Sequence, residues 1–150
     1  RSKRPPLDRV NAMLSFLYTI FTREYAAALE SVGLDSYMGF YHSLRPGRES
    51  LACDLVEEGR CIVERFVLTL INLKIIKPED FDVQVSGAVF LNDDGRKKVL
   101  SKWQEKKRTD MIHPYLKEKI PMGLLPYVQS MLLAKFVRGE IDEYPCYLAK

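Results

Sequence analysis

Residues 8–33, DRVNAMLSFLYTIFTREYAAALESVG, decide the fold class of this chain. Asp8 is a typical N-cap and Gly33 stands where a glycine commonly follows a helix, so the pattern predicts one helix from Asp8 to Val32. Its apolar side chains recur at helical spacing. These residues are Val10, Met13, Leu14, Leu17, Phe21, Ala28 and Leu29. The sequence therefore opens on one long helix.

A second long helix is predicted to begin at Ser50, as its cap, and to end at Lys77-Pro78, so Cys53 and Cys61 would share it. Its apolar stripe also follows helical spacing. The stripe consists of Leu51, Leu55, Ile62, Phe66, Leu70 and Ile71. An aromatic-rich connector, residues 33–47, precedes it and closes in the turn signal 45–48, RPGR.

Further along the chain, Phe81–Val85 and Ala88–Leu91 predict a hairpin around Ser86-Gly87, because β-branched and aromatic residues alternate there. Asn92 or Asp93 would cap a basic helix anchored by Leu100 and Trp103, and a last helix is predicted from about Leu124 to Arg138. We expect a mainly α fold, a multi-helix domain over residues 8–150 with a small β-hairpin insertion. Residues 1–7 look like the remnant of an interdomain linker.

The composition is that of an ordinary globular domain. Of 150 residues, 47% are hydrophobic and 29% charged, which argues against a disordered or disulfide-scaffold chain. The apolar stretches are too short to span a bilayer, so no membrane association is expected. A net charge of +3 is too small to indicate nucleic-acid binding by itself. Three cysteines leave one unpaired, which favours a reducing, cytoplasmic location.

Four residues form the candidate site. Asp54 and Glu57, with Glu58 beside them, lie three apart on one helix, so two carboxylates can approach one ion. Glu30 lies near the end of the first helix and His42 on the connector, and crossing helices could bring all four together. Carboxylates with one imidazole suit Mn²⁺ or Mg²⁺, whereas a structural zinc site is disfavoured because no C-x-x-C pattern occurs.

Each feature also has an ordinary explanation. Glu30 fits a solvated carboxylate at a helix end, and the acidic residues near Asp54 fit a charged first turn favoured by the helix dipole. His42 and His113 fit loop histidines without a chemical role. The basic residues between Arg96 and Arg108 fit a solvated helix face as well as a nucleic-acid surface. Spacing and composition leave both explanations open.

Four blocks in one order resemble the CRISPR-associated adaptation integrases, specifically their catalytic helical domain. The blocks are 11–18 NAMLSFLY, 28–35 ALESVGLD, 39–42 GFYH and 45–58 RPGRESLACDLVEE, and the resemblance continues through 88–91 AVFL, 94–96 DGR and 123–126 GLLP. It is strongest to the subtype I-C branch. One departure follows the acidic pair: Gly59 stands where the family usually has a bulky apolar residue.

The resemblance implies a metal-dependent DNA endonuclease and integrase that inserts foreign DNA into a CRISPR array. By motif position it implies Glu30, His42 and Glu57 as ligands of Mn²⁺ or Mg²⁺, with Asp54 as a further acidic residue of the active site. Basic side chains would then contact DNA phosphates. The candidates are Arg45, Arg48, Arg60, Lys107 and Arg108.

The resemblance also implies partners: prespacer DNA and the CRISPR repeat, a small protein of the adaptation complex, and a second copy of the protein. The family carries a separate N-terminal β-rich domain for dimerisation, which is absent here, so this chain alone is expected to be weak or inactive. The alternative is a non-catalytic helical module that binds DNA or protein through its aromatic and basic surfaces.

Overall fold

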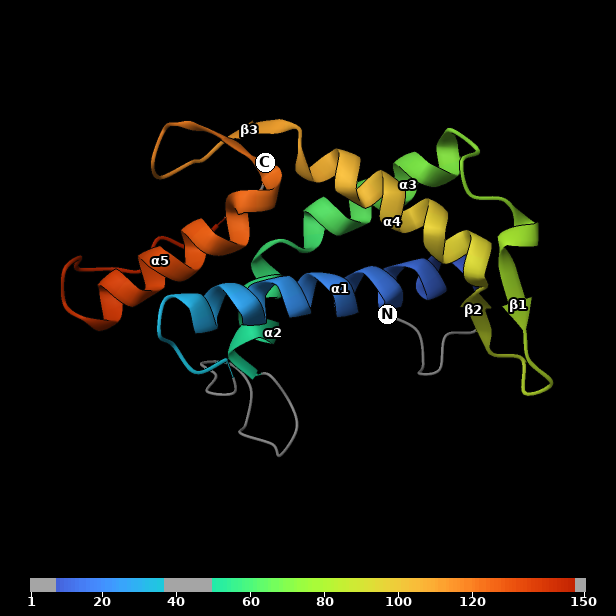
Figure 1. Cartoon of the computed structure of the whole chain (residues 1–150), viewed down its shortest axis with the longest axis horizontal. Helices are drawn as coiled ribbons and strands as arrows, with labels where there is room; N and C mark the ends of the chain where they lie inside the picture. Colours follow the sequence, from blue (N-terminus) through green and yellow to red (C-terminus); the bar gives the residue numbers. More distant parts are fainter. Residues whose placement is uncertain (1–7, 37–49, 148–150) are drawn as a thin grey trace. The chain divides into compact units, whose positions relative to one another are not determined.

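The computed structural model describes residues 8–36 and 50–147 (Figure 1). Within them the fold is mainly helical, with five α-helices and two small antiparallel sheets, which confirms the predicted fold class. The proposed linker, residues 1–7, lies outside the described part of the chain. The helices are α1 (Arg9–Ser31), α2 (Ser50–Glu58), α3 (Arg60–Asn72), α4 (Asp93–Lys107) and α5 (Leu125–Val137). The strands are β1 (Phe81–Val83), β2 (Val89–Leu91), β3 (Asp110–Ile112) and β4 (Lys119–Pro121).

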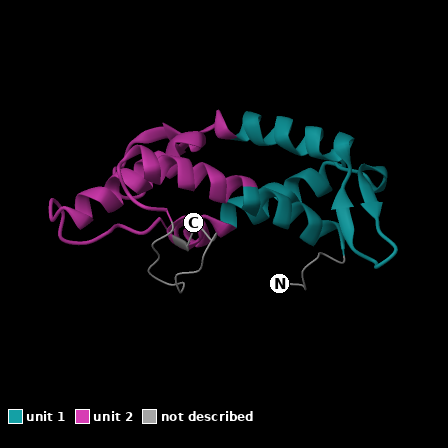
Figure 2. Ribbon diagram, turned by 60° about the horizontal axis from the view of Figure 1, so that its bottom comes forward, with its two compact units in different colours: residues 1–19, 61–106 teal, residues 20–60, 107–150 magenta. Residues whose placement is uncertain are grey.

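These elements form two compact units (Figure 2). Unit 1 comprises residues 1–19 and 61–106, which include the start of α1, helix α3, the β1–β2 hairpin and nearly all of α4. Unit 2 comprises residues 20–60 and 107–150, with the rest of α1, helix α2, the β3–β4 hairpin and α5. Helix α1 therefore contributes to both units.

Helix α1 begins and ends where the sequence predicts. The Asp8 side chain accepts a hydrogen bond from the backbone N–H of Asn11 at 2.8 Å, as an N-cap does. At the other end the N–H of Leu34 reaches back to the carbonyl of Leu29 at 2.9 Å, just beyond the final helical turn. The predicted helix from Asp8 to Val32 is thus confirmed to within a residue at each end.

The predicted second helix is wrong in two respects: it is two helices separated at Gly59, and the second of them ends at Asn72 rather than at Lys77. A Cβ at Gly59 would lie 2.9 Å from Cε2 of the Phe21 ring, so the bare glycine backbone is what allows this ring to approach. Glycine is also a poor helix former. Cys53 and Cys61 consequently lie on different helices, and all three cysteines of the chain are free thiols.

In unit 1 the predicted hairpin is confirmed with shorter strands, and Asp82 pairs with Phe90 in its register. Asn92 is the cap of α4, because its Oδ1 accepts from the N–H of Gly95 at 2.9 Å. Gly95 is required by close packing, since a Cβ there would lie 2.4 Å from the carbonyl oxygen of Asp80. The α4 helix thus starts directly against the turn that precedes β1.

Of the two apolar anchors expected for the basic helix α4, only Trp103 is buried, and Val99 is buried beside it. Trp103 is fully buried and meets Phe66 of α3 edge-on, with ring centroids 5.2 Å apart. Leu100 is instead 37% exposed. Trp103 therefore supplies an aromatic contact between α4 and α3.

Unit 2 contains a second hairpin that the sequence analysis did not predict. Strands β3 and β4 pair antiparallel with Met111 opposite Ile120, and α5 follows within one residue of the expected bounds. Ile120 packs in one buried cluster with Val128 and Leu132 of α5, against which Tyr144 also packs. The hairpin, α5 and the C-terminal segment therefore share one core.

A buried carboxylate in unit 1 gives a stability prediction. Burial alone raises the pKa of Asp80, but hydrogen bonds from the N–H of Lys77 and the ammonium of Lys98 lower it by more, so this pKa lies below its ordinary value. A carboxyl group with a depressed folded-state pKa stabilises the fold above its unfolded-state pKa, about 3.9, and loses this effect as the pH falls through the folded-state value.

Asp80→Asn should therefore lower the free energy of unfolding by about 1–3 kcal/mol at neutral pH. The difference from wild type should shrink as the pH falls below about 3.9, because Asp80 then becomes protonated in the unfolded chain before it does in the folded one. Urea unfolding between pH 3 and pH 7 measures this, with the exposed Asp82→Asn on β1 as control. A difference that stays constant down to pH 3 would contradict the role given to the Asp80 charge.

Candidate active site

Glu30 is held at the end of α1 by a buried serine. Its side chain is exposed, and its Oε1 accepts a hydrogen bond from Ser36 Oγ at 3.1 Å. Ser36 itself is only 1% exposed. The glutamate is thus oriented while part of its carboxylate remains open to a further partner.

Ser36 also holds the beginning of α2. Its carbonyl oxygen accepts a hydrogen bond from the N–H of Leu51 at 2.8 Å. The first N–H groups of a helix lack partners within the helix, so this contact fixes where α2 starts. The two segments that carry the predicted acidic residues therefore meet at Ser36.

Asp54 and Glu57 lie on α2 but differ in environment. Asp54 is buried, at 1% exposure, whereas the Glu57 side chain is 46% exposed. Glu57 forms an ion pair with Arg60 at 3.0 Å, across the break at Gly59. Glu57 is therefore accessible to an external ion or ligand, whereas Asp54 is shielded from solvent.

The remaining predicted ligand, His42, lies outside the described residues, as do Arg45 and Arg48. Among residues 8–36 and 50–147, no group of three or more His, Cys, Asp or Glu side chains is arranged to hold a metal ion. The predicted ligand set includes His42, so it is not contained in that part of the chain.

Glu58, noted in the sequence only as a neighbour of the acidic pair, is the centre of buried contacts. Its Oε1 accepts hydrogen bonds from the Tyr144 hydroxyl and from the N–H of Tyr147, each at 2.9 Å. Burial raises the pKa of this carboxyl group, although both hydrogen bonds oppose that shift. Residues about 90 positions away in the sequence make these contacts, so no local pattern could have indicated them.

His113 is a buried structural residue. It is 1% exposed, and its Nε2 lies 2.5 Å from Oε1 of the equally buried Gln129. Gln129 in turn donates to the Tyr144 hydroxyl at 2.8 Å. The expectation of a loop histidine agrees with its position after β3, but its burial and its partner were not foreseen.

Tyr25 carries a buried hydroxyl in the same unit. Its side chain is fully buried, and among the described residues no hydrogen-bond partner of this hydroxyl is found. Burial, followed by the negative charge of Glu58, raises the pKa of Tyr25 well above its ordinary value. Tyr25 is therefore a neutral phenol within electrostatic reach of Glu58.

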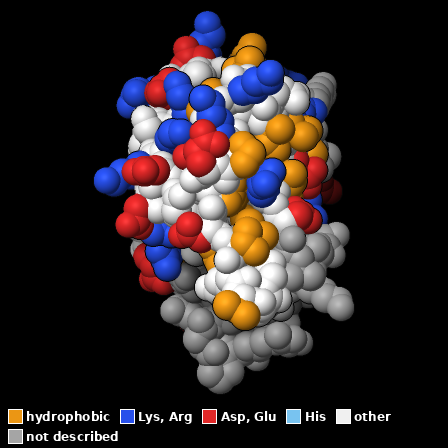
Figure 3. All heavy atoms as spheres, turned by 90° about the vertical axis from the view of Figure 1, so that its right-hand side faces the viewer, with side chains coloured by type: hydrophobic (Ala, Val, Ile, Leu, Met, Phe, Trp, Pro, Cys, Tyr) orange, Lys and Arg blue, Asp and Glu red, His pale blue; other side chains and the backbone are white. Residues whose placement is uncertain are grey.

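Several basic side chains proposed to contact DNA, or placed on the basic helix, are engaged within the fold. Lys107 forms an ion pair with Glu24 at 2.6 Å, and Lys98 pairs with Asp80. Arg108 is exposed. On the face drawn in Figure 3, Lys and Arg side chains are interspersed with Asp and Glu side chains. That face does not present a uniformly positive surface.

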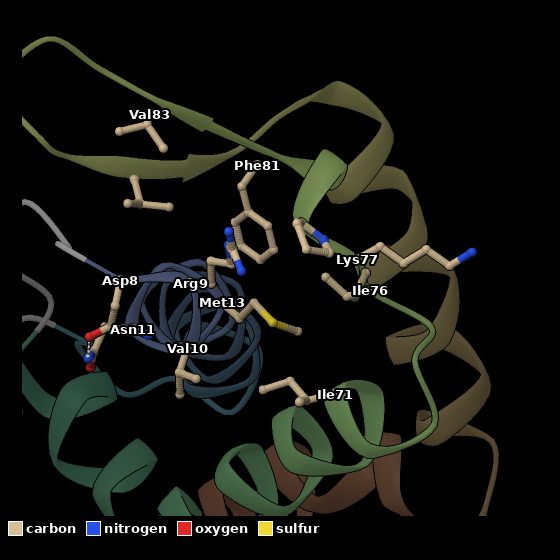
Figure 4. A pocket seen from close by; sticks show the side chains of 12 residues that line it. Asp8, Arg9, Val10, Asn11, Met13, Ile71, Ile76, Lys77, Phe81 and Val83 are labelled. Carbon is tan, nitrogen blue, oxygen red and sulfur yellow. Dashed lines mark hydrogen bonds between the residues drawn. The ribbon is translucent and has the colours of Figure 1, made fainter.

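A pocket of about 760 Å³ in unit 1 offers a different chemistry (Figure 4). Its lining is mostly apolar, with Val10, Met13, Ile71 and Phe81 around it. Among the described residues that line it, Asp8 is the single carboxylate, and it already accepts from Asn11. The pocket is therefore not the candidate metal site.

Within residues 8–36 and 50–147, no helix is long and apolar enough to cross a membrane.

A family model described as CRISPR associated protein Cas1 matches residues 1–105. This chain belongs to the Cas1 family. The CRISPR-associated endonuclease Cas1 2 of Rhodospirillum rubrum is 52% identical over 100% of this chain and 44% of its own length. The CRISPR-associated endonuclease Cas1 1 of Chlorobaculum tepidum is 50% identical over 99% of this chain and 43% of its own length. The chain thus spans less than half the length of these Cas1 relatives, and it corresponds to their C-terminal part.

Solved structures agree with this assignment. A casposase bound to its integration product superposes with a TM-score of 0.88 at 25% identity, over 98% of this chain and 42% of that protein. A Cas1 protein from Thermotoga maritima gives a TM-score of 0.80 at 25% identity, over 94% of this chain and 44% of that protein. The Cas1 fold is therefore shared across nearly the whole chain.

The link through Ser36 gives a prediction for this Cas1 chain. Ser36→Ala removes the hydroxyl that donates a hydrogen bond to Glu30, so the free energy of unfolding should fall by about 1 kcal/mol. The Leu51 amide, which is bound to the carbonyl of the same residue, should exchange faster with solvent. Chemical denaturation and amide hydrogen exchange measure the two effects. Ser31→Ala is the control, since the Ser31 hydroxyl donates to the Ala28 carbonyl within α1 and has no other partner among the described residues. Equal exchange at Leu51 in both variants would contradict the linking role.

Proposed function

We propose that this chain is the catalytic C-terminal part of a Cas1 integrase, a metal-dependent DNA endonuclease that inserts spacers into a CRISPR array. The observation that carries this proposal is 52% identity, over the whole chain, to a relative named CRISPR-associated endonuclease. The structural likeness to a casposase bound to its integration product supports strand transfer as the reaction type. Helix α2, held at both ends by contacts with residues outside it, would carry the acidic residues of the active site.

Glu30, His42 and Glu57 would hold Mn²⁺ or Mg²⁺. The donor set fits such an ion, because both glutamates are exposed and hard carboxylate oxygens with one imidazole match its preference. When bound, the ion would polarise a phosphoryl oxygen and stabilise the charge that develops during strand transfer. Asp54, buried one turn before Glu57, is suited to orienting a ligand or a bound water rather than to meeting the ion from solvent.

Arg60 would pair with Glu57 in the absence of a metal ion and contact a DNA phosphate in its presence. In the structure it neutralises Glu57, with both side chains partly exposed. Binding of a cation by Glu57 would compete with this pair, and the partly exposed guanidinium is of the kind that contacts DNA phosphates. Arg45, Arg48 and Arg108 would add phosphate contacts, and Lys107 a smaller one because Glu24 already pairs with it.

The wider assignment follows the family resemblance. Residues 8–150 would form the catalytic domain of a longer protein of the subtype I-C branch, with residues 1–7 linking it to an N-terminal β-rich domain. That protein would act in the cytoplasm as a homodimer with a small adaptation partner, on prespacer and repeat DNA. The Cas6-RT-Cas1–Cas2 complex, with a TM-score of 0.79 over 100% of this chain, supports such an assembly.

Glu57→Ala and His42→Ala should each abolish Mn²⁺-dependent cleavage and strand transfer by the full-length protein, because each removes a ligand. Mn²⁺ affinity of the chain, measured by calorimetry, should fall by about 100-fold or more, beyond what the loss of an outer-shell partner causes. Glu64→Ala, at an exposed acid on α3, is the matched control. Retained cleavage in both ligand variants would overturn the site assignment and favour a non-catalytic binding module.

The chain by itself should be a weak integrase. Positioning of two DNA ends requires the homodimer, and the proposed dimerisation domain lies outside this sequence. Strand transfer by the 150-residue chain and by the full-length protein can be compared on the same DNA. Comparable rates would contradict the requirement for the missing portion, whereas Mn²⁺ binding by the chain should persist.

A further inference from the structure

Unit 2 contains a set of buried polar side chains that the proposed ligand set does not use. His113 and Gln129 are almost fully buried, and Tyr144 and Glu58 are half-buried. They come from the loop after β3, from α5, from the C-terminal segment and from the last residue of α2. All four elements belong to the same unit.

The hydrogen bonds among these residues run in one direction. His113 Nδ1 accepts from the N–H groups of Tyr115 and Leu116, each at 3.2 Å, so the ring proton is on Nε2 and is donated to Gln129 Oε1. Gln129 Nε2 donates to the Tyr144 hydroxyl at 2.8 Å, and this hydroxyl donates to Glu58 Oε1 at 2.9 Å. The series ends on a carboxylate.

Gln129 is fully used in this network. Its second amide proton is donated to the carbonyl of Pro145 at 3.2 Å, and its oxygen accepts from His113. A buried network with every member satisfied specifies one arrangement, because breaking any link leaves a polar group unpaired away from water. The four side chains therefore have little freedom to reorient.

The network ends at the C-terminal end of helix α2, beside the acidic residues of the candidate site. Glu58 is the last residue of α2, next to Glu57 and one turn beyond Asp54. A second donor, the N–H of Tyr147, binds the same carboxylate oxygen. At the other end of α2, Leu51 is bound to Ser36. A helix of nine residues is therefore held at both ends by residues outside it.

We propose that His113, Gln129, Tyr144 and Glu58 form a positioning network that fixes the C-terminal end of α2, and with it the placement of Asp54 and Glu57 for metal binding. This inference rests on the proposed function for the metal, but not for the anchoring of α2. Tyr144 and Glu58 are positioning residues, since they act through α2 and not on the reacting atoms.

Tyr144→Phe is the decisive variant. It removes the hydroxyl that joins Gln129 to Glu58 but keeps the ring that packs against Ile120, Val128 and Leu132. Tyr127→Phe removes the hydroxyl of an exposed tyrosine on α5 and is the matched control. Glu58→Gln retains an oxygen that can accept both hydrogen bonds, so this conservative variant is expected to keep the anchoring of α2.

Two measurements on the 150-residue chain separate positioning from general stability. Amide hydrogen exchange should speed up across residues 50–58 in Tyr144→Phe and remain unchanged in Tyr127→Phe. Mn²⁺ affinity, measured by calorimetry well below the Tm of each variant, should weaken about 10-fold in Tyr144→Phe, the scale typical of outer-shell partners of metal ligands. Glu58→Gln should stay close to wild type in both measurements.

The outcomes distinguish this inference from the proposed function. Unchanged exchange across residues 50–58 in Tyr144→Phe would overturn the anchoring of α2, whether or not metal binds. Faster exchange with unchanged, Glu57-dependent Mn²⁺ affinity would overturn the positioning role alone. If wild type binds no Mn²⁺ in a Glu57-dependent manner, the proposed function fails and the positioning role fails with it.

Discussion

Helix α2 is nine residues long, and a helix of that length is marginal in water unless other parts of the protein hold it. Its start is fixed by the carbonyl of Ser36 and its end by the contacts of Glu58 with Tyr144 and Tyr147. Both acidic candidates on α2 lie between these two anchors. The placement of Asp54 and Glu57 thus depends on interactions with segments before and far after the helix.

Local sequence signals predicted the features whose causes are local. The cap at Asp8, the β1–β2 hairpin and the bounds of α5 each follow from neighbouring residues, and the structure has them. The helix break at Gly59 was not predicted although glycine is a poor helix former. The close approach of the Phe21 ring at this position could not be predicted, because Phe21 lies far away in the sequence. The β3–β4 hairpin was missed as well, since its connection, residues 113–118, has no glycine to mark a turn, unlike the connection of β1 and β2.

The candidate site divides in the same way. Motif resemblance predicted Glu30, Asp54 and Glu57 as site residues, and the structure adds that Ser36 connects the end of α1 to the start of α2. The role of Glu58 could not be predicted, because its partners lie near the C-terminal end of the described chain and are brought to it only by packing around α5. His42 remains a prediction from the motif alone.

Ion pairing within the fold explains why a net charge of +3 says little about DNA binding. Lys98 forms an ion pair with Asp80, and Lys107 forms one with Glu24. Partial burial strengthens each pair. The pair between Arg60 and Glu57 is different, because both side chains are exposed by more than a third and such pairs contribute little stability. The fold therefore depends little on this pair, in contrast to the pairs of Lys98 and Lys107.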